Sequence, residues 1–467
     1  MSGSTEGAPD AVAYDEDLDP GVEALRADPN PGFGRTLVHL AYDLTWVLAG
    51  LIGSPWLAWK MLRQPAFRRM LAERRVRGEA NRVPARSARP RILVHGVSVG
   101  EVKGARPLVE AIEREYPAFE VFVTSTTDTG MQIAREAFGA DRTLRFPIDP
   151  SWVVRRFLRR VRPDFVVLIE LEIWPNFLRE CNRAGIPVAI VNGRITEVSH
   201  GQYLFFKKVL PQFNRISLFC VQQELYAERF RKLGVEPRRV LCTGNVKADG
   251  LKIGRVDPGD ELRDLLGAED DRAVLVGGST HASEEVLLTR VWRAAAPEAR
   301  LILVPRHPPR CDEVVRELEA AGERPQRLTD LRAGRERPDP DRPAVVDTIG
   351  ELERVYGLGH LVFVGGSLVE HGGQNVLEPA AQGIPVLSGP HTANFVQEVG
   401  LLRRAGALRT VADEDALRAA VAALLADASA RAEMGAAGLR ATEAEKGATG
   451  RNLRALERLA LADLTGA

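Results

Sequence analysis

Two pairs of glycines, followed closely by an asparagine and a glutamate, are the clearest set of residues in this sequence that could bind a ligand. They lie in the segment 361–390, LVFVGGSLVEHGGQNVLEPAAQGIPVLSGP. The apolar run Leu361–Val364 before them predicts one buried strand. A helix is expected to begin near Asn375, and residues 384–387 predict the next strand. The segment therefore predicts a strand, a glycine loop, a helix and a strand, which together form one βαβ unit.

The glycine loop of this unit could hold a phosphate group. It follows the carboxyl end of a parallel strand, where ligands bind in open α/β sheets. Glycines let backbone N–H groups approach a phosphate closely, and a helix N-terminus adds partial positive charge. Glu378, one turn into the helix, is an acceptor suited to ribose hydroxyls. One glycine pair alone could equally serve a tight turn, but two pairs and a carboxylate favour a nucleotide site.

A second candidate loop, HGVSVGEVK at residues 95–103, directly follows another apolar run. Gly96 and Gly100 permit a sharp turn, and Glu101 then opens a helix. The loop matches neither the GxGxxG dinucleotide fingerprint nor a phosphate P-loop. A carboxylate in the first turn of a helix is often only a favourable partner for the helix dipole. For Glu101 considered alone, this simpler interpretation is favoured.

Two carboxylates end the next candidate loop, IELEIWPN at residues 169–176. Glu170 and Glu172 point to the same side if the preceding strand continues through them. Carboxylates at the end of a buried strand are costly unless they meet a cation or a substrate. Lys247, in the motif GNVK, could supply that cation, and one of the two glutamates could be structural.

In the second half of the chain, the motifs GGSTH at 277–281 and PRH at 305–307 each follow an apolar run. Arg306 could bind a phosphate with two hydrogen bonds. A lone histidine such as His281 or His307 is more often structural.

Alternating apolar runs and helical stretches predict two doubly wound α/β domains. The apolar runs are residues 92–94, 121–123, 165–169, 188–191 and 216–221, then 274–276, 301–304, 345–346, 361–364 and 386–387. The boundary is expected at 250–261, which is rich in Gly, Asp and Pro. We therefore expect an N-terminal domain over residues 91–250 and a C-terminal domain over 251–460.

The N-terminal region differs in composition from both domains. Residues 1–35 are rich in Gly, Pro, Asp and Glu and predict a flexible acidic tail. Residues 36–62 contain a long uncharged stretch and three tryptophans, which suit a membrane interface. We expect them to form a membrane anchor that spans or is deeply embedded, although Asp43, Ser54 and Pro55 weaken a spanning helix. A soluble amphipathic helix is the alternative.

The stretch 63–90 is a basic linker or helix with many arginines. By the positive-inside rule it places the following domains on the cytoplasmic side of a membrane. The same arginines could hold anionic lipid headgroups.

The composition narrows the class of protein. The 63 basic and 63 acidic residues give a formal net charge of zero, which argues against general nucleic-acid binding. The four cysteines are scattered without a CxxC pair, so they predict neither a zinc site nor a disulfide framework. They fit a reducing compartment.

Taken together, the motifs closely resemble those of the bacterial lipid A-specific 3-deoxy-D-manno-octulosonic acid (Kdo) transferases. They are HGVSVGE, IELEIWPN, GNVK, GGSTHASEE, VPRHPPR, DTIGELERVYG and FVGGSLVEHGGQNVLEPAAQGIPVLSGPHTANF. The resemblance covers about residues 36–460, and as a set the motifs are highly specific. Gly96 replaces the Ala or Ser usual in the family, and Gln374 replaces the usual His. The second departure leaves open which contacts form near the glycine loop.

The resemblance implies a GT-B fold of two Rossmann-like domains, with CMP-Kdo held by the C-terminal domain. It implies inverting transfer of Kdo to a lipid A precursor at the cytoplasmic face of the inner membrane. It places the general base on Glu101 and supporting electrostatic roles on Glu170 and Lys247. The candidate donor-binding residues are Ser279, Pro305, Arg306, Ile349, Gly350, Glu351, Gly372, Gly373, Asn375, Val376, Leu377 and Glu378. No cofactor or metal is expected, because N–H groups and Arg306 can stabilise the departing CMP.

Two other classes of protein fit the same residues. Another membrane-associated GT-B glycosyltransferase would keep the fold and use a different nucleotide sugar. A non-catalytic nucleotide-sugar sensor would have no need of Glu101 or Arg306, and both are present.

Overall fold

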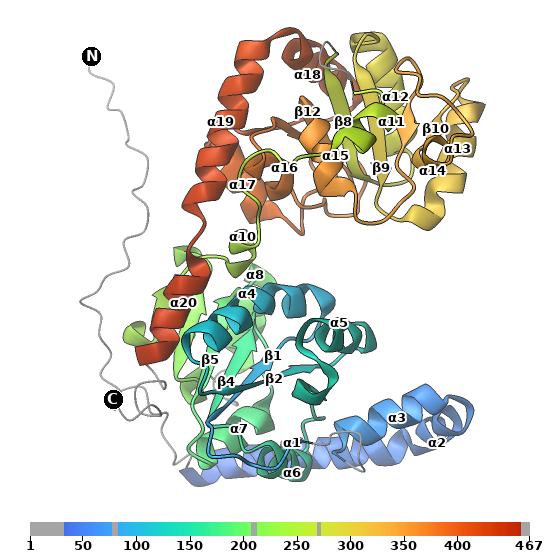
Figure 1. Cartoon of the computed structure of the whole chain (residues 1–467). Coiled ribbons are helices and arrows are strands. Elements are labelled where there is room, and N and C mark those ends of the chain that lie inside the picture. Colours follow the sequence, from blue (N-terminus) through green and yellow to red (C-terminus); the bar gives the residue numbers. More distant parts are fainter. Residues whose placement is uncertain (1–31, 77–82, 207–212, 269–271, 459–467) are drawn as a thin grey trace, which may run out of the picture. The chain divides into compact units, whose positions relative to one another are not determined.

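The computed structural model of the 467-residue chain describes residues 32–76, 83–206, 213–268 and 272–458. Nearly all of the expected acidic tail therefore lies outside the described residues. The chain divides into two compact units (Figure 1). Unit 1 comprises Met1–Gly250 and Lys446–Ala467, and unit 2 comprises Leu251–Glu445.

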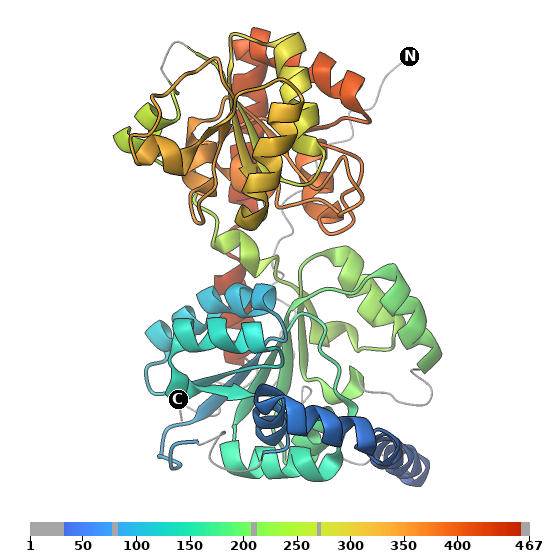
Figure 2. The same ribbon diagram turned by 90° about the vertical axis from the view of Figure 1, so that its right-hand side faces the viewer.

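The described strands of unit 1 form a seven-stranded parallel sheet in the order β3-β2-β1-β4-β5-β6-β7. The strands are β1 Arg91–His95, β2 Glu120–Ser125, β3 Thr143–Arg145, β4 Phe165–Ile169, β5 Val188–Gly193, β6 Leu218–Val221 and β7 Val240–Cys242. The helices are α1 Gly32–Ile52, α2 Ser54–Arg63, α3 Pro65–Arg74, α4 Val99–Glu115, α5 Asp128–Phe138, α6 Ser151–Val161, α7 Pro175–Arg183, α8 Glu197–Phe206, α9 Glu224–Lys232, α10 Val246–Asp249 and α20 Ala448–Leu456. Helices cover both faces of the sheet (Figure 2). Ile92 and Val94 enter one core and Leu93 the other, so the centre of β1 is apolar on both faces.

Unit 2 repeats this architecture with the described strands in the order β10-β11-β9-β8-β12-β13-β14, again all parallel and seven in number. Its strands are β8 Val274–Thr280, β9 Arg300–Pro305, β10 Gln326–Arg327, β11 Ala344–Val345, β12 Leu361–Val364, β13 Val386–Ser388 and β14 Leu408–Thr410. Its helices are α11 Asp260–Leu265, α12 Glu284–Ala295, α13 Cys311–Ala320, α14 Leu328–Arg332, α15 Leu352–Leu358, α16 Leu377–Ala381, α17 Val396–Arg404, α18 Glu414–Ala426 and α19 Ala428–Ala444. The α/β class and the two doubly wound sheets expected from the sequence are confirmed.

Each sheet has one point where the strand order reverses. In unit 1 it lies between β1 and β4, and in unit 2 between β8 and β12. Ligands bind at such switch points in open α/β sheets, outside the carboxyl ends of the strands. The loops at 95–103 and 169–176 follow β1 and β4, and the loops at 281 and 365–376 follow β8 and β12.

The strands that the apolar runs did not predict are β3, β7, β10 and β14. Each is only two or three residues long, and β3, β10 and β14 contain an arginine. They lie at sheet edges, where pairing on one side suffices and a continuous apolar run is not required.

The end of the second domain differs from the expected bounds. The division after Gly250 lies in the expected boundary region, but the chain returns to unit 1 at Lys446. There α20 packs against α4 and α10, and Thr243 Oγ1 donates a hydrogen bond to Asn452 Oδ1 (3.0 Å). Residues 446–460 were expected in the C-terminal domain.

The hydrophobic N-terminal segment is not one continuous helix. Gly53 separates α1 from α2, and Pro55, which has no N–H to donate, lies in the first turn of α2. In the described part of the chain no single helix is long and apolar enough to cross a membrane. The bent pair Leu37–Ile52 and Ser54–Arg63, with 60° between them, reaches the required length and composition only together.

One face of α1 is fixed to unit 1 by buried polar contacts. Asp43 Oδ1 accepts hydrogen bonds from the Ser151 N–H (2.9 Å) and from Asn176 Nδ2 (2.8 Å). His39 pairs with Asn176 Oδ1 (3.3 Å) and with the Arg215 guanidinium (2.8 Å). Burial, above all, lowers the pKa of His39 to about 4, so the ring is neutral and can accept from Arg215. Asp43 thus joins α1 to α6 and α7.

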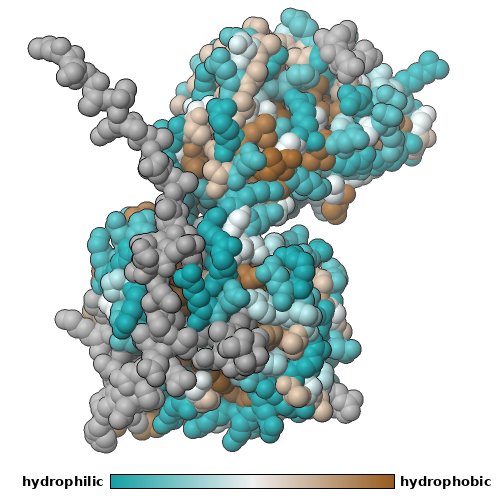
Figure 3. Space-filling view, turned by 60° about the vertical axis from the view of Figure 1, so that its left-hand side comes forward, coloured by the Kyte–Doolittle hydropathy of each residue, from teal (hydrophilic) through white to brown (hydrophobic). Residues whose placement is uncertain are grey.

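The other face of α1 and much of α2 are apolar and exposed. The exposed large side chains there are Leu37, Leu40, Leu44, Val47, Leu48, Leu51, Ile52, Trp56, Trp59 and Leu62. On the face of unit 2 that Figure 3 shows, hydrophobic areas are instead interspersed with hydrophilic ones. An amphipathic helix of this kind can lie in the plane of a membrane interface.

Arginines of the basic stretch divide into two groups. Arg86 forms an ion pair with Asp164 (2.7 Å), and Arg89 donates to the carbonyls of residues 117–119. The arginines of α2 and α3 that are exposed are Arg63, Arg68 and Arg69. The later arginines therefore bind unit 1, and the earlier ones remain on the surface next to the apolar face.

Candidate functional site

Glu101 lies in the first turn of α4, directly after β1. The Ser98 Oγ accepts a hydrogen bond from the Glu101 N–H (3.4 Å) and donates one to Glu101 Oε1 (2.9 Å). Glu101 Oε2 accepts from the Val97 N–H (2.5 Å). This reciprocal arrangement is close to a capping box, so Glu101 does stabilise the helix start. The same contacts hold the carboxylate in a fixed position. A Cβ on Gly96 would lie 3.1 Å from the Glu101 Cβ.

Three carboxylates interact electrostatically at this edge of the unit 1 sheet. Burial raises the pKa of Glu101 above its ordinary value, and the charge of Glu170 raises it further. Burial also raises the pKa of Glu172 to about 7, with contributions from the charges of Glu101 and Glu170. A carboxylate whose pKa is raised toward neutrality is a better general base than an exposed one.

Lys247 supplies the cation expected for this group. Its Nζ forms an ion pair of 2.7 Å with Glu170 Oε1. Strand β4 ends at Ile169, and Glu170 adopts a left-handed φ of +63°, so the strand does not continue through Glu172. The condition for Glu170 and Glu172 to share one side is therefore not met. Gly104 of α4 leaves room for the lysine, because a Cβ there would lie 3.3 Å from Lys247 Cε.

In unit 2 the first glycine pair is held by a buried glutamate. Glu284 Oε2 accepts from the N–H groups of Gly366 (2.7 Å) and His281 (2.9 Å). Its Oε1 accepts from the N–H groups of Ser367 (3.1 Å) and Leu368 (3.0 Å). These N–H groups are therefore not available to a phosphate, contrary to the expectation for the first glycine pair. The carboxylate ties the loop after β12 to the loop after β8.

Replacing Glu284 by glutamine should lower the free energy of unfolding of unit 2 by about 1.5–3 kcal/mol, the value of a hydrogen bond to a charged group. The amide nitrogen of glutamine cannot accept a hydrogen bond, so two of the four N–H groups lose their acceptor. Chemical denaturation followed by circular dichroism measures the change. The exposed Glu319→Gln on α13 is the matched control, and equal stability of both variants would contradict this role of Glu284.

The second half of the glycine loop leads into α16 and contains the half-buried polar side chains of Asn375 and Glu378. The Asn375 amide donates to Glu378 Oε1 (2.9 Å), and Asn375 Oδ1 accepts from the Leu377 N–H (3.1 Å). No hydrogen bond among the described residues uses the N–H of Asn375 or Val376. Burial raises the pKa of Glu378, and the nearby positive charge of Arg306 opposes this. Arg306 and Glu378 are therefore close enough for their charges to interact.

The remaining predicted residues of unit 2 lie at the ends of β8 and β9, in the glycine loop itself and directly before α15. Ser279 has a left-handed φ of +52°, and the Arg306 N–H donates to the Thr280 carbonyl (2.9 Å), which joins the ends of β8 and β9. Gly372 and Gly373 both have positive φ, which favours glycine. Ile349, Gly350 and Glu351 precede α15, which packs against α16. Glu351 is already paired with Arg332 (3.1 Å) and Arg354 (3.0 Å).

Sequence reasoning missed Glu284, although it contributes to this geometry. Its motif, GGSTHASEE, was recognised, but nothing in the spacing indicates a carboxylate that binds a loop more than 80 residues away. Glu284 accepts from N–H groups in the glycine loop. In such a loop the sequence predicts phosphate binding as readily as binding by a carboxylate of the same chain.

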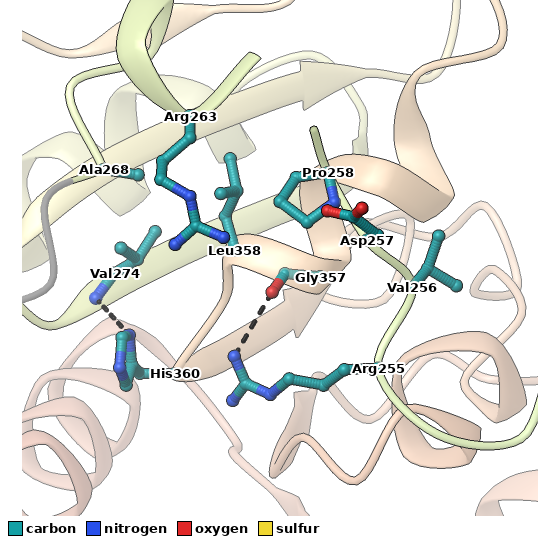
Figure 4. Close-up of a pocket in the computed structure, with 10 residues that line it drawn as sticks. All are labelled: Arg255, Val256, Asp257, Pro258, Arg263, Ala268, Val274, Gly357, Leu358 and His360. Atoms are coloured by element: carbon teal, nitrogen blue, oxygen red, sulfur yellow. Dashed lines mark hydrogen bonds between the residues drawn. The ribbon is translucent and has the colours of Figure 1, made fainter. Parts of the chain in front are cut away.

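A separate cavity of about 390 Å³ lies in unit 2 beside the start of β8 (Figure 4). Arg255, Arg263 and His360 point toward it, and the Arg255 guanidinium donates to the Gly357 carbonyl (3.2 Å). None of the predicted site residues lines this cavity. Because it opens near the amino-terminal strand edge, we do not assign it to the nucleotide site.

Within the described ranges no group of three or more His, Cys, Asp or Glu side chains is arranged to hold a metal ion.

Comparisons with known proteins agree with this architecture. Residues 69–250 match the family model of 3-deoxy-D-manno-octulosonic-acid transferase (kdotransferase). The chain is 34% identical over 406 residues to the 3-deoxy-D-manno-octulosonic acid transferase of Haemophilus influenzae, covering 85% of this chain and 92% of that protein. It is 33% identical over 430 residues to the enzyme of the same name from Bordetella pertussis, covering 88% and 98%.

A solved glycosyltransferase from Rickettsia africae is similar in fold. The TM-score is 0.53 at 9% sequence identity, over 79% of this chain and 98% of that structure. The similarity establishes the two-domain GT-B fold.

Proposed function

The chain belongs to the 3-deoxy-D-manno-octulosonic acid (Kdo) transferase family, and we propose that it moves Kdo from CMP-Kdo to a lipid A precursor. It is a glycosyltransferase of lipopolysaccharide biosynthesis. The observation that carries the proposal is the Glu101 carboxylate, fixed by Val97 and Ser98 at the switch point of unit 1 with a raised pKa.

Glu101 is the proposed general base. An acceptor hydroxyl attacks the anomeric carbon of Kdo, the bond from that carbon to the CMP phosphate breaks, and the hydroxyl proton passes to the Glu101 carboxylate. Attack on the face opposite the leaving group inverts the anomeric centre. Lys247, paired with Glu170, partly neutralises the negative charge of the carboxylates around the base.

Unit 2 is the proposed donor-binding unit. The departing CMP gains negative charge on its phosphate, which Arg306 and the free N–H groups of Asn375 and Val376 can stabilise. Glu378, held by the Asn375 amide, accepts from ribose hydroxyls. The proposal includes no metal or other cofactor, and unchanged turnover in EDTA would support that part of it.

Arg306→Ala and Glu378→Ala should each weaken CMP binding roughly tenfold or more. Each removes a charged hydrogen bond, the first to phosphate and the second to ribose, and such bonds contribute about 1.5–3 kcal/mol. Calorimetric titration with CMP measures the affinities. The exposed Arg316→Ala on α13 is the control. Unchanged affinity in both site variants would contradict the proposed donor site.

The acceptor and its location are also part of the proposal. The exposed apolar face of α1 and α2, next to Arg63, Arg68 and Arg69, suits the interface of a membrane with anionic lipids. We therefore propose that the enzyme acts at the cytoplasmic face of the inner membrane, where a lipid acceptor is held.

One assay tests the proposed reaction. Purified protein is incubated with CMP-Kdo and a lipid A precursor, and mass spectrometry counts the Kdo residues added. Transfer from another nucleotide sugar instead would favour a different GT-B enzyme. Nucleotide binding without transfer to any acceptor would favour a sensor.

A further inference from the structure

Three histidines from three separate loops meet at the switch point of unit 2. His281 follows β8, His307 follows β9, and His371 lies in the loop after β12. The rings of His281 and His371 stack with centroids 4.2 Å apart and 27° between their planes. His307 meets His281 edge-on at 5.9 Å. His281 is buried, whereas His307 and His371 are exposed. The cluster is therefore a buried imidazole with two exposed ones on it.

The surrounding residues hold the buried imidazole in place. The Glu284 carboxylate binds the N–H of His281 and three N–H groups of the glycine loop, so the two loops cannot separate freely. Gly366 leaves space for the ring, because a Cβ there would lie 3.1 Å from His281 Cδ2. The Gln374 amide nitrogen lies 3.1 Å from His281 Nε2. Since an amide N–H₂ only donates, His281 Nε2 accepts and carries no proton.

The charges around the cluster are mainly positive. Burial, followed by the nearby positive charges of His371, His307, Arg310 and Arg306, lowers the pKa of His281 to about 4.

Most carboxylates near the cluster are already engaged. Both oxygens of Glu284 accept backbone N–H groups, and Glu285 and Glu313 pair with Arg310 at 3.3 and 3.6 Å. Glu370 precedes His371 and is exposed. Glu378 accepts from the Asn375 amide and interacts with Arg306 only at longer range, and in the described part of the chain Arg306 has no carboxylate within ion-pair distance. An anion bound beside Arg306 would therefore balance an excess of positive charge.

We propose that His371, supported by His281 and accompanied by His307, binds an oxyanion of the sugar nucleotide together with Arg306. The inference rests on the proposed function, because that function supplies the ligand. The donor offers two oxyanions, the CMP phosphate and the Kdo carboxylate, and either can accept a charge-assisted hydrogen bond from an imidazolium. Gln374 acts as a positioning residue, since it sets which nitrogen of His281 carries the proton.

Calorimetry with three ligands tests the proposal. Cytidine has neither anion, CMP has the phosphate, and freshly prepared CMP-Kdo has both. The variants are His371→Ala and His307→Ala, both at exposed positions where the fold should be retained. The control is His360→Gln, at the amino-terminal edge of the same sheet, which keeps an acceptor for the Val274 N–H.

We expect His371→Ala to weaken binding of CMP-Kdo about tenfold or more, with a smaller loss for His307→Ala and none for the control. An equal loss for CMP with unchanged cytidine affinity assigns the cluster to the phosphate. Unchanged CMP affinity assigns it to the carboxylate. Equal losses for all three ligands, or wild-type affinity for CMP-Kdo in both variants, would overturn the inference. Wild-type protein that binds neither CMP nor CMP-Kdo would instead refute the proposed function.

Discussion

Replacing Glu101 by glutamine is expected to lower the turnover number about 10²–10⁴-fold, the usual loss when a general base is removed. The amide fits the same space, and its carbonyl oxygen can still accept from the Val97 N–H or the Ser98 hydroxyl. It cannot take a proton from the acceptor hydroxyl. CMP affinity should be unchanged, because Glu101 belongs to unit 1 and the donor residues belong to unit 2. Initial rates with CMP-Kdo and a detergent-dispersed acceptor measure the effect.

The pH profile separates a chemical role from a structural one. Only the ionised carboxylate of Glu101 accepts a proton, so wild-type turnover should fall as the pH is lowered through its raised pKa. The residual activity of the glutamine variant should lack this dependence on Glu101. Glu110→Gln, on the exposed face of the same helix, is the control and should keep wild-type rates. Near wild-type turnover of Glu101→Gln would remove this residue from the mechanism.

Replacing Asp43 by alanine is expected to lower the free energy of unfolding of unit 1 by about 2–6 kcal/mol. The change leaves two buried donors, the Ser151 N–H and the Asn176 amide, without their acceptor. Each unsatisfied buried donor costs about 1–3 kcal/mol. Chemical denaturation measures the loss. Because α1 is part of this contact, deleting residues 36–62 should also destabilise unit 1, so truncation is not a clean test of membrane binding.

The neighbouring residue offers the matched variant. Leu44 is exposed on the apolar face of α1, so Leu44→Ser should leave unfolding unchanged and weaken binding to vesicles that contain anionic lipid. Asp43→Ala should show the reverse pattern. If Leu44→Ser left vesicle binding unchanged, the proposed membrane face would be wrong. If Asp43→Ala left unfolding unchanged, the polar contact would not hold α1.

Several features of the site follow from local sequence. The apolar runs predict the central strands because a strand buried on both faces must be largely apolar, as in β4. Polar residues directly after such runs must lie at the carboxyl edge of a parallel sheet. Glu101, Glu170 and Arg306 were identified on this basis.

The partner of Lys247 could be anticipated in part. A carboxylate at the end of a buried strand requires a cation, and this reasoning pointed to the pair of glutamates in IELEIWPN. The structure selects Glu170, because the left-handed turn at that residue directs the chain away from the strand before Glu172.

The sequence by itself determined the two α/β units and the loops that carry the chemistry, because each depends on periodicity within a few neighbouring residues. Only the tertiary structure decided that Glu284 occupies the N–H groups of Gly366 and the two residues after it, that Asp43 joins α1 to α6 and α7, and that three histidines meet. These contacts join residues that lie from 26 to 133 positions apart. The local sequence around a carboxylate does not show whether that carboxylate faces water, a helix start or a distant backbone N–H. Its hydrogen-bond donor is brought to it only by the folded chain.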